Sequence, residues 1–538
     1  MATLLLIVAC ALLTCIYLML KKRLARRKFL AFAETNNCSP IRTAQDQNWP
    51  WGLDRLYALL TARRNGKDAL DDYMAPPLYE HKTLQRQSIG GSYVIETAEP
   101  AIAQAILSTQ SSDFALGSTR RRVFRPVEGP GISAFTSDGA EWHYARAMLR
   151  TSFAKERLND LEATERNLGI MFEAIEGPGA DGWTGVVDMQ PLVYRFVLDS
   201  ATKFLFGESV ESQTAFMKRK VHADAHNARQ TAMSDLAISD GFAESFDTVL
   251  HWLFLRFRLR GLAFLGTSAT FRKANKTLER FLKYAIDKQL SVEQPETLKS
   301  KTSMLSGLTE KIRNPDDLRA QLTGLLFAGR DATGSLILLT LLLLSRHPDI
   351  YTKLHSLVLA TFPEPHGTPL NHTHLQSFRY LRHIINETLR LYSVLPLNSR
   401  IATRDTVIPL GGGEDGKQPA AVYKGQQIQL NIYAMHRRKD LWGEDALEFR
   451  PERWEDPKRS ALLEDGWAFI PFSRGPRVCI GQQYALTEAS YCLVRFVQRF
   501  DRIAPDPGDA GKGAEIKKAI AVAMAPAEAK LRLHPADH

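Results

Sequence analysis

Cysteine is one of the scarcest residues in this chain, with 5 among 538 residues. Two cysteines lie in an apolar N-terminal segment and the other three are scattered, so the sequence indicates no disulfide framework. That pattern suits a reducing compartment for the main body of the protein. No second cysteine or histidine stands near Cys479 at a spacing typical of zinc ligands. A disulfide-stapled secreted domain and a zinc site at Cys479 are therefore both excluded.

Nucleotide-binding signatures are missing as well. The spacing Gly411-x-x-x-x-Gly416-Lys417 imitates a phosphate-binding loop. However, Gln418 takes the place of the required Ser or Thr, and Pro419 stands where the helix should begin. We therefore predict a turn between two short strands here. The chain also has no flavin-binding segment, so any electrons that it uses must come from a partner protein.

Acidic residues are absent before Glu34, and the N-terminal end is apolar and then basic. Ala2–Leu20 is an uninterrupted apolar run that spans roughly 28 Å as a helix, close to the thickness of a bilayer's hydrocarbon core. The basic cluster Lys21–Lys28 follows the run. A cleaved signal peptide has the opposite order, and the positive-inside rule keeps such a cluster in the cytosol. We predict an uncleaved anchor at 1–20, a basic flank and linker at 21–50, and a cytosolic body at 51–538.

The net charge of +10 is concentrated in this cluster, whose six basic residues leave only +4 for the rest of the chain. A body so nearly balanced needs no polyanionic partner. We therefore expect no nucleic acid to bind.

Helical periodicity dominates the body. A long helix is predicted to begin after the cap residue Asn314, with Pro315 at its first position, and to continue to about Ser345. Strand-forming residues gather at Ser92–Glu96 and at Val422–Tyr433. The fold class predicted is mainly α with a small β portion, built as one large domain.

A Gly/Pro-rich loop at 472–482 contains a lone cysteine and precedes an apolar helical run from about Tyr484 to Phe500. We expect Gly475 and Gly481 to adopt backbone angles that other residues avoid. Cys479 should lie just before a helix N-terminus, where the helix dipole and Arg477 favour a thiolate. A lone thiolate can be the one protein ligand of a haem iron.

The pattern Phe-x-x-Gly-x-Arg-x-Cys-x-Gly in this loop resembles the haem-binding loop of the cytochrome P450 family. The resemblance implies the P450 fold and a haem b whose iron is bound by Cys479, in a loop shaped by Phe472 and Gly481. The Trp-x-x-x-Arg pattern on a helix beginning near Ser137 resembles the family's propionate-binding helix. The haem's carboxylates are then expected to meet Trp142, Arg146, Arg400 and Arg477.

The segment Ala328–Gly334 lies inside the long helix. Two glycines, an acid and a hydroxyl suit a widened groove that holds a small ligand and a proton path, while a helix kink with a surface ion pair is an equal alternative. The segment resembles the family's oxygen-binding motif, which implies proton delivery by Asp331. Ala332 stands where the family has a threonine. Either Thr333, Ser335 or a substrate hydroxyl is therefore expected to order the water, or oxygen activation is unusual in this protein.

Two further motifs resemble parts of the family's structural core. Glu387-Thr388-Leu389-Arg390 places an acid and an arginine on one helical face, which alone indicates an ordinary surface pair. Phe449-Arg450-Pro451-Glu452-Arg453-Trp454 follows. Together they resemble the family's Glu-x-x-Arg helix and Pro-Glu-Arg segment, which implies that Glu387, Arg390 and Arg453 support the cysteine loop.

The resemblance is closest to the fungal membrane-bound group that hydroxylates alkanes and fatty acids. It implies a monooxygenase of the endoplasmic reticulum membrane that uses O₂ and NADPH-derived electrons. NADPH–cytochrome P450 reductase is the implied donor, with cytochrome b5 as an optional second one. A polyketide or terpenoid substrate, and a haem-thiolate isomerase or dehydratase that uses no O₂, are the alternatives.

Contacts with a small apolar substrate are expected at Ala328, Ala332, Leu395 and Leu397 and along a loop at Val123–Phe135. The run Trp252–Arg260 interleaves apolar and basic residues. It suits either a segment that dips into the membrane surface or an ordinary helix covering the core.

Overall fold

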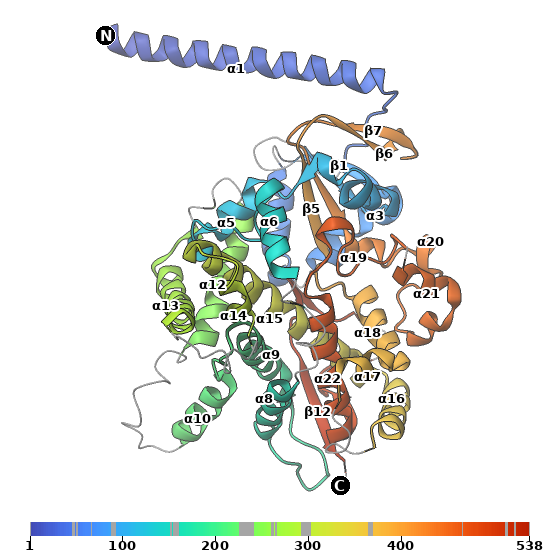
Figure 1. Cartoon of the computed structure of the whole chain (residues 1–538). Coiled ribbons are helices and arrows are strands. Elements are labelled where there is room, and N and C mark those ends of the chain that lie inside the picture. Colours follow the sequence, from blue (N-terminus) through green and yellow to red (C-terminus); the bar gives the residue numbers. More distant parts are fainter. Residues whose placement is uncertain are drawn as a thin grey trace. The chain divides into compact units, whose positions relative to one another are not determined.

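The computed structural model is mainly helical and contains several small β-sheets (Figure 1). It describes residues 2–45, 49, 52–65, 67–87, 93–150, 153, 161–224, 241–259, 263, 266–291, 303–363, 370–464, 466–509, 511, 515–520 and 523–536. The chain forms two compact units, each assembled from separate segments. Unit 1 comprises 1–115, 397–435 and 474–476, and unit 2 comprises 116–396, 436–473 and 477–538.

The first helix of unit 1, α1, runs from Ala2 to Thr35 and contains both the apolar run and the basic cluster. Large apolar side chains along it are exposed, among them Leu13 at 65% and Leu20 at 59%. Near its end, the ring of Phe29 meets the ring of Tyr423 edge-on at 5.7 Å. After the helix, Ile41 forms an isolated antiparallel bridge with Gly412, which is distant in the sequence.

The main sheet of unit 1 has the strand order β1-β2-β8-β5-β3. Its strands are β1 (Thr83–Gln87), β2 (Tyr93–Thr97), β8 (Gln427–Asn431), β5 (Leu397–Ala402) and β3 (Phe114–Ala115). The helices of this unit after α1 are α2 (Leu53–Thr61), α3 (Pro76–His81), α4 (Pro100–Gln104) and α19 (Ile432–Met435).

Both strand predictions fall in unit 1, together with the predicted turn. The hairpin of β6 (Thr406–Gly412) and β7 (Gln418–Val422) confirms a turn between short strands. The strand-like stretch Val422–Tyr433 is confirmed in part, because it contains β8 and the last residue of β7, but Gly425 at φ +88° turns the chain between these two strands. The other expected strand is β2, whose preceding residue Ser92 lies outside the described residues.

Unit 2 is built around α15, which runs from Pro315 to Arg346 (Figure 1). As expected, the Asn314 side chain caps this helix by accepting a hydrogen bond from the Asp316 amide. Leaving aside α1, several of whose side chains lie outside the described residues, α15 is the one described helix long and apolar enough to cross a membrane, but 72% of its most apolar window is buried in the protein. It is therefore a core helix.

The other helices of unit 2 surround α15 and its neighbours. In chain order they are α5 (Ser118–Glu128), α6 (Gly139–Arg150), α8 (Glu162–Glu173), α9 (Met189–Phe206), α10 (Ser212–Asp224), α12 (Phe242–Leu259), α13 (Ala269–Ser291), α14 (Met304–Thr309), α16 (Pro348–Thr361), α17 (His372–Ser377), α18 (Arg379–Leu391), α20 (Lys439–Trp442), α21 (Pro457–Glu464) and α22 (Gln482–Arg499). Strands β4 (Val187–Asp188), β12 (Lys530–Pro535) and β9 (Phe500–Pro505) form one small sheet, and β10 (Lys518–Ile520) pairs with β11 (Met524–Pro526).

The loop expected at Val123–Phe135 is helical in its first half. Val123, Phe124 and Val127 belong to α5 and are fully buried in the apolar core, so they are not open to a substrate. Residues 129–135 do form an irregular segment.

Pro126 lies inside α5 and has no N–H to offer the carbonyl of Arg122 one turn earlier. Arg256 of α12 donates to the Arg122 carbonyl at 3.2 Å and to the Val123 carbonyl at 3.2 Å. The carbonyl of Pro126 itself accepts from Asn275 of α13 at 2.9 Å. Side chains of two other helices thus satisfy the backbone of α5.

Arg256 also decides how the run Trp252–Arg260 is placed. Its side chain is buried, and Leu253 beside it is fully buried in the core. Over its described part, this run is therefore a helix that covers the core, and Arg260 lies outside the described residues.

Candidate functional site

The cysteine loop is closed by a backbone hydrogen bond from the Cys479 amide to the Phe472 carbonyl at 3.0 Å. Gly475 has φ +73°, and a Cβ placed on it would lie 1.9 Å from the Leu107 carbonyl oxygen, so only glycine fits. Gly481 caps α22 at φ −90°, an angle open to any residue. The expectation of a special backbone angle is therefore correct for Gly475 and wrong for Gly481.

The Cys479 thiol lies in surroundings that differ from the expected ones. Burial among protein atoms raises its pKa, while the Gly481 amide and Arg146 act to lower it. Arg477 is not among the groups that act on it, and the net shift opposes a thiolate rather than favouring one. The side chain is nevertheless exposed.

Two of the expected cationic residues differ in how they are held. Arg477 donates to the carbonyl of Ser137 at 3.1 Å and to Asp138 at 2.9 Å, and its guanidinium stacks on the Trp142 ring at 4.3 Å. Burial lowers the pKa of Arg477 to about 10. Arg146 is half-buried on α6, one turn after Trp142, and has no hydrogen bond or carboxylate partner in the described part of the chain.

Arg400 belongs to β5 of unit 1. It is buried, and it donates to the Asn398 side chain at 2.7 Å and to the Ser399 carbonyl at 2.8 Å. A further arginine, Arg120 of α5, escaped the sequence reasoning. It lies over the Phe135 ring at 5.1 Å, and burial lowers its pKa against the opposing effect of Asp138. In the sequence Arg120 belongs to a run of three arginines, and that run does not indicate which of the three is buried.

The middle of α15 carries an accessible stripe on a helix that is otherwise buried. Leu325, Ala328, Gly329 and Ala332 are half-buried or exposed, while most of their neighbours are buried. The spacing i, i+3, i+4, i+7 puts them on one face. Open space lies in front of Gly329, where a Cβ would meet nothing within 4 Å.

Gly334 does not share this role. A Cβ there would lie 2.6 Å from the Tyr194 ring of α9, so this glycine lets two helices pack closely. Of the two glycines expected to widen a groove, only Gly329 has open space in front of it.

The residues expected to move protons are buried to different degrees. Asp331 accepts from the neighbouring Arg330 at 3.0 Å, and burial raises the pKa of its carboxyl although Arg330 acts to lower it. Thr333 is 1% exposed, and its hydroxyl has no hydrogen-bond partner in the described part of the chain. The Ser335 hydroxyl lies 3.0 Å from that of Tyr194.

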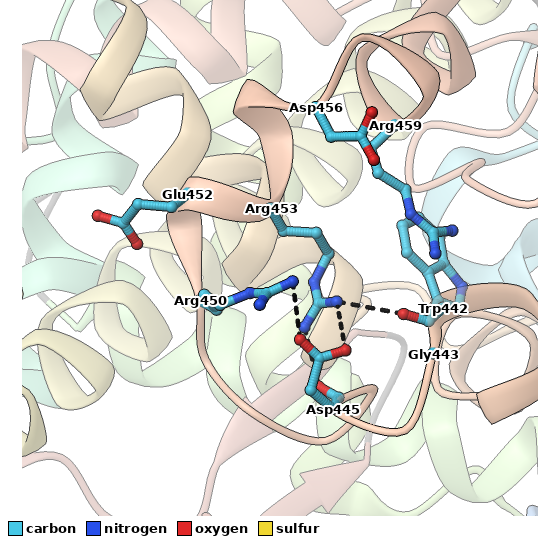
Figure 2. A pocket seen from close by; sticks show the side chains of 8 residues that line it. All are labelled: Trp442, Gly443, Asp445, Arg450, Glu452, Arg453, Asp456 and Arg459. Atoms are coloured by element: carbon cyan, nitrogen blue, oxygen red, sulfur yellow. Dashed lines mark hydrogen bonds and ion pairs between the residues drawn. The ribbon is translucent and has the colours of Figure 1, made fainter.

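Glu387, Arg390 and Arg453 lie together and are fully buried. Arg390 binds both carboxylate oxygens of Glu387 at 2.9 Å, and Arg453 reaches the same carboxylate at 3.2 Å. Arg453 continues to Asp445 and to the carbonyl of Trp442, as Figure 2 shows. The hollow in that view measures about 330 Å³ and is lined by charged side chains and one indole ring.

The other two residues expected to contact the substrate lie on either side of the point in the sequence where unit 2 gives way to unit 1. Leu395 of unit 2 is 44% exposed, while Leu397 begins β5 of unit 1 and is half-buried. Each is open enough to contact a ligand.

Several observations fit a haem in unit 2. Among the described residues, no three His, Cys, Asp or Glu side chains gather to hold a bare metal ion. A lone cysteine such as Cys479 can serve as the one protein ligand of a haem iron. Arg146 offers a cation without a carboxylate partner, which suits a propionate.

Comparison with known proteins identifies the family. A family model described as Cytochrome P450 matches residues 64–533. The cytochrome P450 monooxygenase alt2 of Alternaria solani is 37% identical over 481 residues, which cover 87% of this chain and 86% of the relative. Cytochrome P450 52A12 of Debaryomyces hansenii is 39% identical over 423 residues, 77% of this chain and 78% of the relative.

A solved structure, that of the cytochrome P450DA heme domain, matches with a TM-score of 0.70 at 20% identity and covers 93% of this chain and 98% of that one. It supports the fold, which is mainly helical with small sheets. The chain belongs to the cytochrome P450 family of haem-thiolate monooxygenases.

Proposed function

We propose that this chain is a membrane-anchored monooxygenase that hydroxylates a long-chain alkane or fatty acid with O₂ and NADPH-derived electrons. The observation that carries the proposal is the accessible stripe of α15. Its members, Leu325, Ala328, Gly329 and Ala332, include no polar side chain. Such a surface favours an apolar chain over a polar ligand, because polar groups of a ligand would lose their hydrogen bonds with water there.

Each residue of the site then has a role. Cys479 is the iron ligand, in a loop shaped by Phe472 and Gly481. Arg146, Arg477 and Arg400, together with Trp142, hold the propionates, and Arg477 is steadied by its bonds to Ser137 and Asp138. Haem on a thiolate supplies the oxygen-activating chemistry.

The polar residues of α15 and the supporting cluster complete the proposal. Asp331 passes protons to the accessible face of α15, with Thr333 beside it. Glu387, Arg390 and Arg453 hold the backbone that carries the cysteine loop. Ala328, Ala332, Leu395 and Leu397 contact the substrate.

The anchor is α1. Its exposed apolar side chains suit a hydrocarbon environment, and the basic cluster after them suits the cytosolic membrane surface. We infer a single-pass protein of the endoplasmic reticulum membrane with its catalytic body in the cytosol. There it meets NADPH–cytochrome P450 reductase, and cytochrome b5 is an optional second donor.

A second substrate class is favoured by one observation. Ala332 has no hydroxyl, and the Thr333 hydroxyl is buried away from solvent. A substrate with a hydroxyl of its own, such as an oxygenated polyketide or terpenoid, would hydrogen-bond to the proton-delivering water that neither Ala332 nor Thr333 contacts.

The test begins with the iron ligand. The spectrum of the reduced carbon monoxide complex should show a thiolate-bound haem in the native protein and in Cys38→Ala, and should lose that band in Cys479→Ala. With reductase and NADPH supplied, products from hexadecane and palmitate should exceed those from hydroxylated polyketides and terpenoids. A thiolate band that survives Cys479→Ala contradicts the ligand assignment, and turnover confined to oxygenated substrates supports the second class.

A further inference from the structure

A buried arginine on α15 joins three helices outside the haem-binding loop. Arg330 has 4% of its side chain exposed. Its guanidinium lies over the Tyr194 ring of α9 at 4.5 Å and over the Phe246 ring of α12 at 5.2 Å. Desolvated cations packed against aromatic faces are held firmly. The guanidinium is therefore a fixed point between α9, α12 and α15.

Two carboxylates share this one guanidinium. Arg330 Nη1 donates to Asp247 of α12 at 2.5 Å and to Asp331 of α15 at 3.0 Å. The two acids differ in their access to water, because the Asp247 side chain is 59% exposed and the Asp331 side chain only 14%. Asp247 thus forms the solvent end of the group and Asp331 its interior end.

The charges in this group do not balance. One cation faces two carboxylates, and the remaining neighbour, Tyr194, is neutral because burial raises the pKa of its phenol to about 12. Beside this group the imbalance is reversed, because Arg195 of α9 and Arg219 of α10 both pair with the single carboxylate of Glu244, at 3.6 Å and 3.0 Å. The excess negative charge therefore lies at the Arg330 end, where the uptake of one proton removes it. Asp331 is the natural site for it, because burial and the Asp247 charge both raise the pKa of its carboxyl.

We propose that Asp247 is a positioning residue for Asp331: by sharing Arg330 from the solvent side, it frees the Asp331 carboxyl to carry protons from bulk water to the accessible face of α15. This inference rests on the proposed function of that face. In each passage one proton joins an Asp331 carboxylate oxygen while the ion pair with Arg330 breaks. The same proton then leaves for a water molecule beside Ala328 and Ala332, the ion pair re-forms, and no electron moves.

The matched control lies on the same helix. Glu244 stands one turn before Asp247 and pairs with Arg219 at 3.0 Å and with Arg195, not with Arg330. Glu244→Gln removes the same charge from the same helix but leaves Arg330 shared. Asp247→Asn leaves Arg330 to Asp331 alone, which stabilises the ionised form of Asp331 and lowers its pKa.

Two measurements on the full-length haem protein test the proposal. With reductase and NADPH, Asp247→Asn should lower product formation at pH 7.5 by about tenfold for each unit by which the Asp331 pKa falls, with the alkaline limb of the pH profile moved to lower pH. Glu244→Gln and Asp247→Glu should keep the native profile. The haem-thiolate band should stay unchanged in all three variants.

The second measurement does not depend on turnover. An acid whose pKa is raised on folding stabilises the fold at low pH and loses that contribution as the pH rises through its folded pKa. Native protein and Glu244→Gln should therefore lose unfolding free energy as the pH rises above the ordinary aspartate range, and Asp247→Asn should lose less.

Equal pH profiles and equal unfolding curves in Asp247→Asn and Glu244→Gln would overturn the proposal, even with a native thiolate band and native products. Absence of that band or of any product in the unmodified protein would instead overturn the proposed function. In that case the unfolding comparison still decides whether Asp247 controls Asp331.

Discussion

Unit 2 contains two buried arginine–carboxylate clusters that are built in opposite ways. Around Glu387, both arginines also bind backbone carbonyls: Arg390 reaches those of His436 at 2.9 Å and Ala446 at 2.6 Å, and Arg453 that of Asp445 at 2.8 Å. Around Arg330, one guanidinium is shared by two carboxylates, of which one lies at the surface.

The number of partners that each arginine has decides whether a cluster can change its protonation state. In the Glu387 cluster the two guanidinium groups have more N–H donors than one carboxylate can accept. The remaining donors bind backbone carbonyls of 436–448, so removing any one side chain leaves a buried polar group without its partner. In the Arg330 cluster a carboxylate can take up a proton and leave while the guanidinium keeps its second partner. The first arrangement locks a fold, and the second permits a proton to move.

The largest effect is expected from Glu387→Gln. This change leaves Arg390 buried without a countercharge and leaves Arg453 with Asp445 alone, and breaking such a buried pair costs about 3–5 kcal/mol. Urea unfolding should show that loss, together with poor haem incorporation. Glu452→Gln is the control, because that acid is part-exposed and pairs with Lys353 at 2.8 Å. A Glu387→Gln protein as stable as the control would remove the distinction between a locking and a movable cluster.

A smaller loss is expected from Arg330→Met. The methionine keeps apolar contact with Tyr194 and Phe246, and Asp331 can escape the missing countercharge by remaining protonated. We expect a cost of about 1–3 kcal/mol at pH 6, which grows with pH as the stranded Asp331 is forced to ionise. Thermal unfolding across pH 5–9 measures it, with Arg195→Met as the control. A loss as large as that of Glu387→Gln would make the two clusters equivalent.

The contrast also marks how far the sequence could predict the site. Glu387 and Arg390 are three residues apart on one helix, which alone indicated a surface pair. The resemblance of this motif and of the segment around Arg453 to those of the family implied that the three residues act together. The fold class followed in the same way from periodicity and from the cysteine loop. These features are encoded over short stretches of chain.

Other features depend on partners that are distant in sequence. Asp247 approaches Arg330 from another helix, and Gly334 faces a Tyr194 ring that no motif announces. Likewise, Arg146 rather than Arg477 acts on Cys479, because the choice depends on how α6 packs against the loop. Tertiary packing decides such contacts, and local spacing carries no record of it.

The smallest effect is expected where an uncharged side chain binds a backbone carbonyl of α5, as the arginines near Glu387 bind the carbonyls of 436–448. Asn275 donates to the carbonyl of Pro126 at 2.9 Å and also to Glu279 at 3.0 Å. Asn275→Ala leaves that carbonyl buried without its donor, at a cost of about 1 kcal/mol. Hydrogen exchange should accelerate in α5 but not at 436–448, while Lys276→Ala, which changes an exposed neighbour, should leave both unchanged. If exchange accelerates in both regions, α5 and the Glu387 cluster open as one cooperative unit. If it accelerates only in α5, that helix can open while the locked cluster stays closed.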